Sequence, residues 1–139
     1  MGLDLYLFKK DINIQEVRNN ISNLYEKLRA IQEEIEQAED IYDDAKLADV
    51  NITHNLNKMA DAVGLYEVLW KPDEIGITIA SQMIPSLEKG IKKLREDPEK
   101  YKAFNAPNGY GNYEDFVRFC DSVLHCCNKY PDSVIEANG

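Results

Sequence analysis

The feature that most constrains this chain is a heptad repeat of apolar residues in its first third. The repeat steps alternately by three and four residues, and we call its members the heptad stripe: Ile14, Val17, Ile21, Leu24, Leu28, Ile31, Ile35, Ala38, Tyr42 and Ala45. A helix that rises about 1.5 Å per residue would place all of them on one narrow face. The repeat therefore predicts one helix over residues 13–47, about 45 to 50 Å long, which packs on another helix or on a second copy of itself.

The last part of this predicted helix is strongly acidic. Its charged residues are Glu33, Glu34, Glu36, Glu39, Asp40, Asp43, Asp44 and Asp49, with Lys46 as the basic exception. Charge runs on helices usually form a solvated face. The other interpretation is a surface over residues 33–49 that mimics nucleic acid or docks on a basic protein, because such a field steers positively charged partners toward it.

Shorter apolar patterns in the second half predict further helices and helical turns. They cover residues 52–63, 65–70, 77–94, 98–101 and 113–127. Pro85 should kink the 77–94 helix or mark its true start, with Thr78 as a candidate cap. This helix is the natural partner for the long one. Gly64 is placed to end a helix, and Asn112 is placed to cap the last one.

A small β element is predicted at the start of the chain, where apolar and other residues alternate over residues 3–8. Its nearby candidate partners are residues 75–77 and the tail around residues 134–135, so any sheet is small and peripheral. The predicted fold class is mainly α, a helical bundle with one long heptad-patterned helix, in a hairpin or coiled coil, and this β element. With 139 residues we expect a single domain over 1–139, whose compact helical part covers about 51–130.

Composition narrows the function classes. A net charge of −9 opposes general binding to the nucleic-acid backbone or to an anionic membrane. The sequence shows neither a signal-peptide pattern nor an apolar run long enough for a membrane helix, so we expect a cytoplasmic protein. The cysteines are Cys120, Cys126 and Cys127, which lack the spacing of a zinc site or a disulfide framework. We expect reduced, half-buried thiols and no cofactor or metal.

Recognised catalytic signatures are absent, which argues against an enzyme. The chain has no phosphate-binding glycine-rich loop, no nucleophile elbow and no pair of histidines at metal-binding spacing. His125 and Cys126 are neighbours in the predicted last helix, where they would point about 100° apart. The sequence therefore gives no Cys–His dyad.

Two clusters of polar residues are candidates for a binding site. The first consists of Asn51, Thr53, His54 and Asn55 at a predicted helix start, where free backbone N–H groups favour an anion. The alternative is simple helix capping. The second is the loop over residues 108–113, which contains Asn108, Tyr110, Asn112 and Tyr113. Its glycines allow close backbone approach and its tyrosines offer flat stacking faces, although a tight turn before a capped helix is the alternative.

Tyr66 and Trp70 lie between the two clusters in sequence, one helical turn apart. Aromatic residues at this spacing are more often part of a core than of a ligand site. Together with the clusters, however, they supply stacking faces, amides, a histidine and a helix start. This set suits a pocket for a nucleobase, sugar or phosphate compound.

Four segments of the chain resemble a family of small proteins encoded by phages and prophages. They are MGLDLYL at residues 1–7, NITHNL at 51–56, GLY followed by Trp70 and Pro72 at 64–72, and NGYGNYE at 108–114. The resemblance implies a host-takeover or anti-defence factor in the bacterial cytoplasm. Some such factors sequester nucleotide immune signals, and others are acidic inhibitors that cover a host nuclease.

The leading prediction is a phage-type, non-enzymatic protein that binds and sequesters a small nucleotide-like ligand. The residues predicted to hold phosphate or ribose are Asn51, Thr53, His54 and Asn55. The residues predicted to stack on a base are Tyr66, Trp70, Tyr110 and Tyr113, flanked by Asn108 and Asn112. The predicted acceptors for hydroxyl or amino groups are Asp4 and Glu114. The alternatives are an acidic inhibitor of a host protein acting through the 33–49 face, and a small nucleotide-processing enzyme with His54 and Glu114 as acid and base. A homo-oligomer could form through the long helix.

Overall fold

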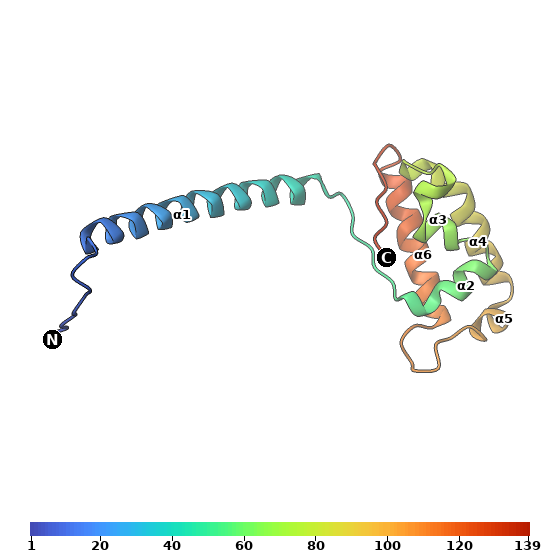
Figure 1. Cartoon of the computed structure of the whole chain (residues 1–139). Helices are drawn as coiled ribbons and strands as arrows, with labels where there is room; N and C mark the ends of the chain where they lie inside the picture. Colours follow the sequence, from blue (N-terminus) through green and yellow to red (C-terminus); the bar gives the residue numbers. More distant parts are fainter. The chain divides into compact units, whose positions relative to one another are not determined.

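The computed structural model describes all 139 residues and confirms a mainly helical protein (Figure 1). Its contacts divide the chain into two compact units, residues 1–46 and residues 47–139, and each is described here by itself. Whether the two units form the predicted single domain over residues 1–139 stays a prediction. No helix in either unit combines the length and apolar composition that a bilayer span requires.

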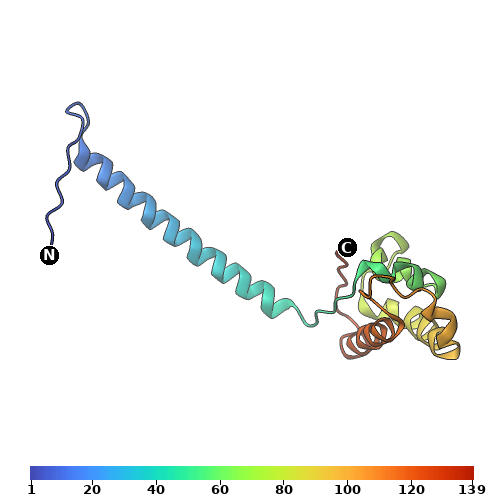
Figure 2. The same ribbon diagram turned by 90° about the horizontal axis from the view of Figure 1, so that it is seen from below.

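The first unit contains one long helix, α1 (Ile14–Ala45), which confirms the prediction from the heptad repeat. Asn13 caps its start, where Asn13 Oδ1 accepts a hydrogen bond from the backbone N–H of Glu16 at 3.1 Å. The helix is continuous along its length (Figure 2). None of its residues is buried, and the apolar stripe from Val17 to Ile35 is 44% to 54% exposed.

The strand predicted over residues 3–8 is not formed, because this segment takes part in no β-bridge. Its predicted partner at 75–77 is interrupted by Gly76, whose φ of +78° ends a 3₁₀ turn instead of continuing a strand. The chain contains a single antiparallel bridge, between Ile79 and Val134. Alternation alone was misleading here, since a strand is stable only when a neighbour pairs with its backbone groups.

The second unit is built from short helices and 3₁₀ turns. In chain order they are η1 (His54–Leu56), α2 (Asn57–Ala62), α3 (Tyr66–Trp70), η2 (Pro72–Ile75), η3 (Ala80–Met83), α4 (Ile84–Glu96), α5 (Pro98–Lys102) and α6 (Tyr113–Lys129). Pro85 lies in the first turn of α4 and does not kink it. This confirms the prediction that Pro85 marks the true start of the helix. Thr78 is not a cap; its backbone N–H instead donates to the side-chain oxygen of Gln82 at 2.7 Å. Asn112 does cap α6 as predicted.

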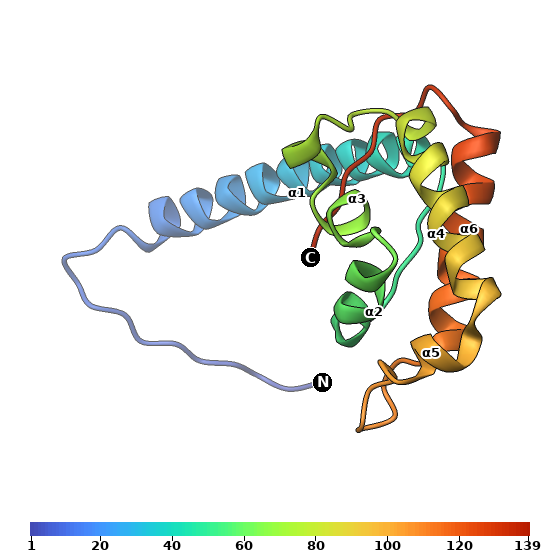
Figure 3. The same ribbon diagram turned by 90° about the vertical axis from the view of Figure 1, so that its right-hand side faces the viewer.

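The core of the second unit is enclosed by η1, α2, α3, α4 and α6, and α4 and α6 run side by side (Figures 1 and 3). Its largest fully buried side chains are Leu56, Met59, Leu65, Leu87, Leu94, Phe116, Cys120 and Cys127. Gly90 allows a close approach in this core, because a Cβ at that position would lie 2.5 Å from Leu65 Cδ1. The apolar stripe of α4 is thus covered within the second unit.

Candidate functional site

The two polar clusters predicted from the sequence meet in the second unit. Asn55 Nδ2 donates a hydrogen bond to the backbone carbonyl of Tyr110 at 3.1 Å, across 55 residues of sequence. Gly111 then lies directly against Thr53, since a Cβ on this glycine would be 2.7 Å from Thr53 Cγ2. The φ of Gly111 is +108°, a backbone conformation that strongly favours glycine. The loop before α6 is therefore held against the segment that precedes η1.

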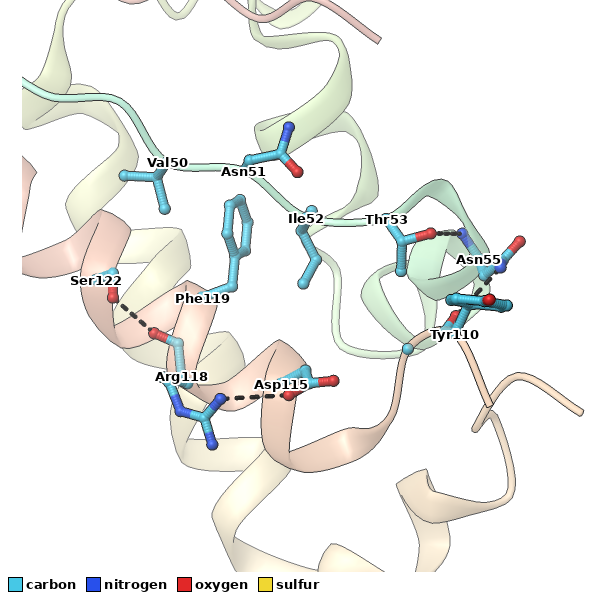
Figure 4. Close-up of a pocket in the computed structure, with 11 residues that line it drawn as sticks. Val50, Asn51, Ile52, Thr53, Asn55, Tyr110, Asp115, Arg118, Phe119 and Ser122 are labelled. Atoms are coloured by element: carbon cyan, nitrogen blue, oxygen red, sulfur yellow. Dashed lines mark hydrogen bonds and ion pairs between the residues drawn. The ribbon is translucent and has the colours of Figure 1, made fainter. Parts of the chain in front are cut away.

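An open groove of about 550 Å³ runs beside this junction (Figure 4). Its lining residues are Val50, Asn51, Ile52, Thr53, Asn55, Tyr110, Gly111, Asp115, Arg118, Phe119 and Ser122. One wall is formed by the extended residues 50–53 together with Asn55 of η1, and another is the exposed face of α6. The groove combines amides and hydroxyls with aromatic surface, which is the usual composition of a small-molecule site.

The wall from α6 contains residues that the sequence analysis missed. Asp115, Arg118 and Ser122 lie three and four positions apart, so they share one face of the helix. Arg118 Nη1 lies 3.3 Å from Asp115 Oδ1, and Ser122 Oγ donates to the carbonyl of Arg118 at 2.9 Å. Arg118 is the single basic residue of the lining. The sequence shows that these three residues share a helix face. The sequence does not show that residues 50–55 form the facing wall of the groove.

Two aromatic rings border the groove. Phe119 projects from α6 toward the segment over residues 50–52 (Figure 4). Tyr110 is 72% exposed, and its backbone N–H donates to Asn108 Oδ1 at 3.0 Å. Asn108 therefore shapes the turn that presents Tyr110. Phe119 is half-buried and stacks on Phe116 with ring centroids 6.5 Å apart, so Tyr110 has the more accessible ring of the two.

His54, Tyr66 and Trp70 form a separate cluster, and none of them lines the groove. Trp70 Nε1 donates to His54 Nδ1 at 3.1 Å. The rings of Tyr66 and Trp70 stack with centroids 5.6 Å apart and an interplanar angle of 22°. The structure thus divides the predicted site, since it places His54 with the aromatic pair and Asn51, Thr53 and Asn55 with Tyr110.

The helix start predicted as an anion site is short. It consists of the single 3₁₀ turn η1 followed by the six residues of α2. Thr53 Oγ1 accepts a hydrogen bond from the backbone N–H of Asn55 at 3.4 Å, which is the capping alternative. The cation of the groove, Arg118, is therefore a stronger candidate for an anion than this helix start.

Tyr113 has a role in the core. Its ring is buried, and its hydroxyl donates to the backbone carbonyl of Leu94 at 2.7 Å. Burial raises the pKa of the Tyr113 hydroxyl above its ordinary value. A ring held in this way has no free face for a ligand.

The remaining predicted site residues lie outside the groove. Asn112 Oδ1 accepts from the backbone N–H of Asp115 at 2.9 Å, which is its capping bond. Glu114 Oε1 lies 3.7 Å from Lys102 Nζ on the surface. Asp4 belongs to the first unit. Of the residues predicted from the sequence, the groove therefore collects Asn51, Thr53, Asn55 and Tyr110.

No protein-family model, curated protein or solved structure matches this chain. The resemblance to phage-encoded proteins thus remains a prediction.

Cys120 and Cys127 offer no activated nucleophile. All three cysteines are free thiols, and Cys120 and Cys127 are buried where half-buried side chains were expected. Burial raises the pKa of Cys120 to about 12 and also raises the pKa of Cys127. A thiol must ionise to attack, so these two residues are unreactive near neutral pH. No group of three or more His, Cys, Asp or Glu side chains is arranged to hold a metal ion.

Proposed function

We propose that the second unit binds a small nucleotide-like ligand in the groove and does not transform it. The observation that carries this proposal is the hydrogen bond from Asn55 to the Tyr110 carbonyl, which joins the two polar clusters into one site. This bond fixes amide and hydroxyl groups beside an exposed aromatic ring. Nucleotides combine a flat base, hydroxyl groups and an anionic phosphate, and the groove offers a partner for each of these.

Each part of the ligand has candidate contacts. Tyr110 and Phe119 supply faces for a base, and Asn51 supplies an amide for its polar edge. Arg118 is the candidate for the phosphate, because a guanidinium binds phosphate through two parallel hydrogen bonds. Its ion pair with Asp115 is solvent-exposed. Exposed pairs contribute only about 0 to 1 kcal/mol, so a phosphate can compete for Arg118.

Binding without catalysis is favoured by what the lining contains. The groove includes no histidine and no cysteine, and Asp115 is its single carboxylate. The acid and base of the enzyme alternative, His54 and Glu114, both lie outside it. General acid–base catalysis requires groups within hydrogen-bond reach of the reacting atoms, which these residues do not provide.

The biological role that follows from the sequence resemblance is sequestration. A phage-type protein that binds a nucleotide signal without consuming it lowers the free concentration of that signal in proportion to its own abundance. We propose this anti-defence role as the reason for a binding site without a catalyst.

The test is native mass spectrometry of the chain with a panel of linear, cyclic and NAD-derived nucleotides, followed by titration calorimetry with any compound that binds. Tyr110→Ala and Arg118→Gln should each weaken binding by about tenfold or more, through the lost stacking face and the lost charge-assisted hydrogen bonds. His54→Ala is the matched control outside the groove and should leave the affinity unchanged. Absence of an adduct with every compound would contradict the proposal, and a ligand of altered mass would indicate an enzyme instead.

A second candidate function is protein inhibition through the acidic part of α1, favoured by the exposure of every acidic side chain in that helix. The outward-facing residues Asp40, Asp43 and Asp44 would carry the contact. An electrostatic complex of this kind weakens as ionic strength rises, and reversal of these three charges should abolish it. Insensitivity to both changes would argue against this function.

A further inference from the structure

The heptad stripe of α1 is an apolar surface without a partner in its own unit. The residues of the stripe from Val17 to Ile35 remain 44% to 54% exposed, and no residue of α1 is buried. A narrow stripe that repeats every 3.5 residues is the surface that two-stranded coiled coils bury. We propose that a second copy of this chain covers it, with the two α1 helices antiparallel and centred between residues 29 and 30.

The sizes of the stripe residues match in this antiparallel register. In heptad notation, with Ile14 at position a and Val17 at position d, each a residue faces a d residue of the other copy. The facing pairs are Ile14 with Ala45, Val17 with Tyr42, Ile21 with Ala38, Leu24 with Ile35, and Leu28 with Ile31. The large Ile14 and Ile21 near the start of one helix thus meet the small Ala45 and Ala38 near the end of the other helix, and the large Tyr42 meets the smaller Val17.

The parallel register lacks this match. Each residue of the stripe would then face its own counterpart, so Ala38 would meet Ala38 and Ala45 would meet Ala45. The bulky Tyr42 would meet Tyr42 between these two thin layers. Cores lose stability both where side chains leave voids and where they are overpacked.

Charge also favours the antiparallel arrangement. Residues 14–29 carry three basic and two acidic side chains, whereas residues 30–45 carry seven acidic and no basic ones. A parallel pair would place the two acidic halves side by side. An antiparallel pair places each acidic half against the half that holds the basic residues, which lowers the repulsion.

The residues that flank the stripe give specific pairs. Antiparallel helices bring position e next to e and position g next to g of the partner helix, so Arg18 lies near Glu39 and Lys27 lies near Glu34. Both pairs are attractive, and each occurs twice in the dimer. In the parallel register position g lies near e, and Glu34 would approach Glu39 with like charge.

The decisive experiment is sedimentation equilibrium of the full chain with substitutions at Lys27 and Glu34. The native chain should dimerise. Glu34→Lys places lysine against Lys27 in the antiparallel dimer and should weaken it roughly tenfold, with a similar loss for Lys27→Glu. An equal mixture of the two variants should form a heterodimer of nearly native affinity, because every facing pair is again attractive.

Glu33→Lys is the matched control, since it makes the same charge change on the outer face of α1 and should leave dimerisation nearly unchanged. The fluorescence of Trp70 reports in every sample that the second unit remains folded. A chain that stays monomeric at all concentrations would overturn the proposal and assign the stripe to a partner of different sequence. Tighter association of Glu34→Lys, without recovery in the mixture, would overturn it in favour of a parallel pair.

Discussion

Trp70 donates its indole N–H to Nδ1 of His54 at a distance of 3.1 Å. The bond joins the turn η1 to α3 and engages a nitrogen of the histidine that the sequence predicts as a phosphate or ribose contact. It explains why the polar cluster divides, since His54 turns toward the aromatic pair while Thr53 and Asn55 line the groove.

Loss of this bond should be visible in the fluorescence of Trp70, the single tryptophan of the chain. In His54→Ala the half-buried indole N–H loses its acceptor and turns to water, so we expect emission at longer wavelength. His125→Ala is the control, because His125 is an exposed residue of α6. Identical spectra for His54→Ala and the native chain would show that the bond is not formed in solution.

Gly111→Ala should destabilise the second unit by about 2 to 4 kcal/mol, because it adds a steric clash with Thr53 to an unfavourable φ. Gly109→Ala is the matched control. Its φ is +78°, but a Cβ there has no atom within 4 Å, so only the backbone term of about 1 kcal/mol applies. Urea denaturation measures both free energies of unfolding. Equal losses for the two variants would mean that the loop does not approach Thr53 closely.

Tyr113→Phe should cost about 1 to 2 kcal/mol of stability and leave ligand affinity unchanged. The hydroxyl of Tyr113 satisfies the carbonyl of Leu94, which lies in the last turn of α4 where helix carbonyls lack partners within the helix. Tyr110→Phe removes a hydroxyl from an exposed ring and should change stability by less than about 0.5 kcal/mol. Urea denaturation measures the free energy of unfolding of both variants. A Tyr113→Phe variant as stable as the native chain would contradict the role of the Tyr113 hydroxyl.

Stability should fall in alkaline solution through Cys120. Its pKa is about 12 in the folded chain and 9.0 in its ordinary state, so above pH 9 the unfolded chain releases this proton first. The stability that the buried neutral thiol of Cys120 contributes is fully present below pH 9. It is lost between pH 9 and 12, by up to about 1.4 kcal/mol of unfolding free energy per pH unit. Cys120→Ala should show a shallower decline in the free energy of unfolding over this range. Parallel pH profiles for the two chains would show that Cys120 is not buried as a neutral thiol.

Features encoded by nearby residues could be predicted from the sequence. The heptad repeat predicts α1, and Asn112 and Asp97 cap helices because each accepts from a backbone N–H three residues ahead. Alternation over residues 3–8 failed as a predictor, because the existence of a strand depends on a distant partner.

The candidate site was only partly predictable for the same reason. The polar character of Asn55 and Tyr110 is plain in the sequence, but their contact spans 55 residues. Arg118 and Ser122 resemble any other exposed polar residues of a helix. Only the packing of α6 beside residues 50–55, which run into η1, makes them part of a groove.

The pairing proposed for α1 would tie the order of this exposed segment to the amount of protein present. A lone helix gains no stability from tertiary packing and frays, whereas a paired one is held by its partner, so mass action sets the ordered fraction. Over the 32 residues of α1, dilution would loosen the chain and accumulation would stiffen it. With that pairing, the fraction of the chain held as stable helix would rise with protein concentration.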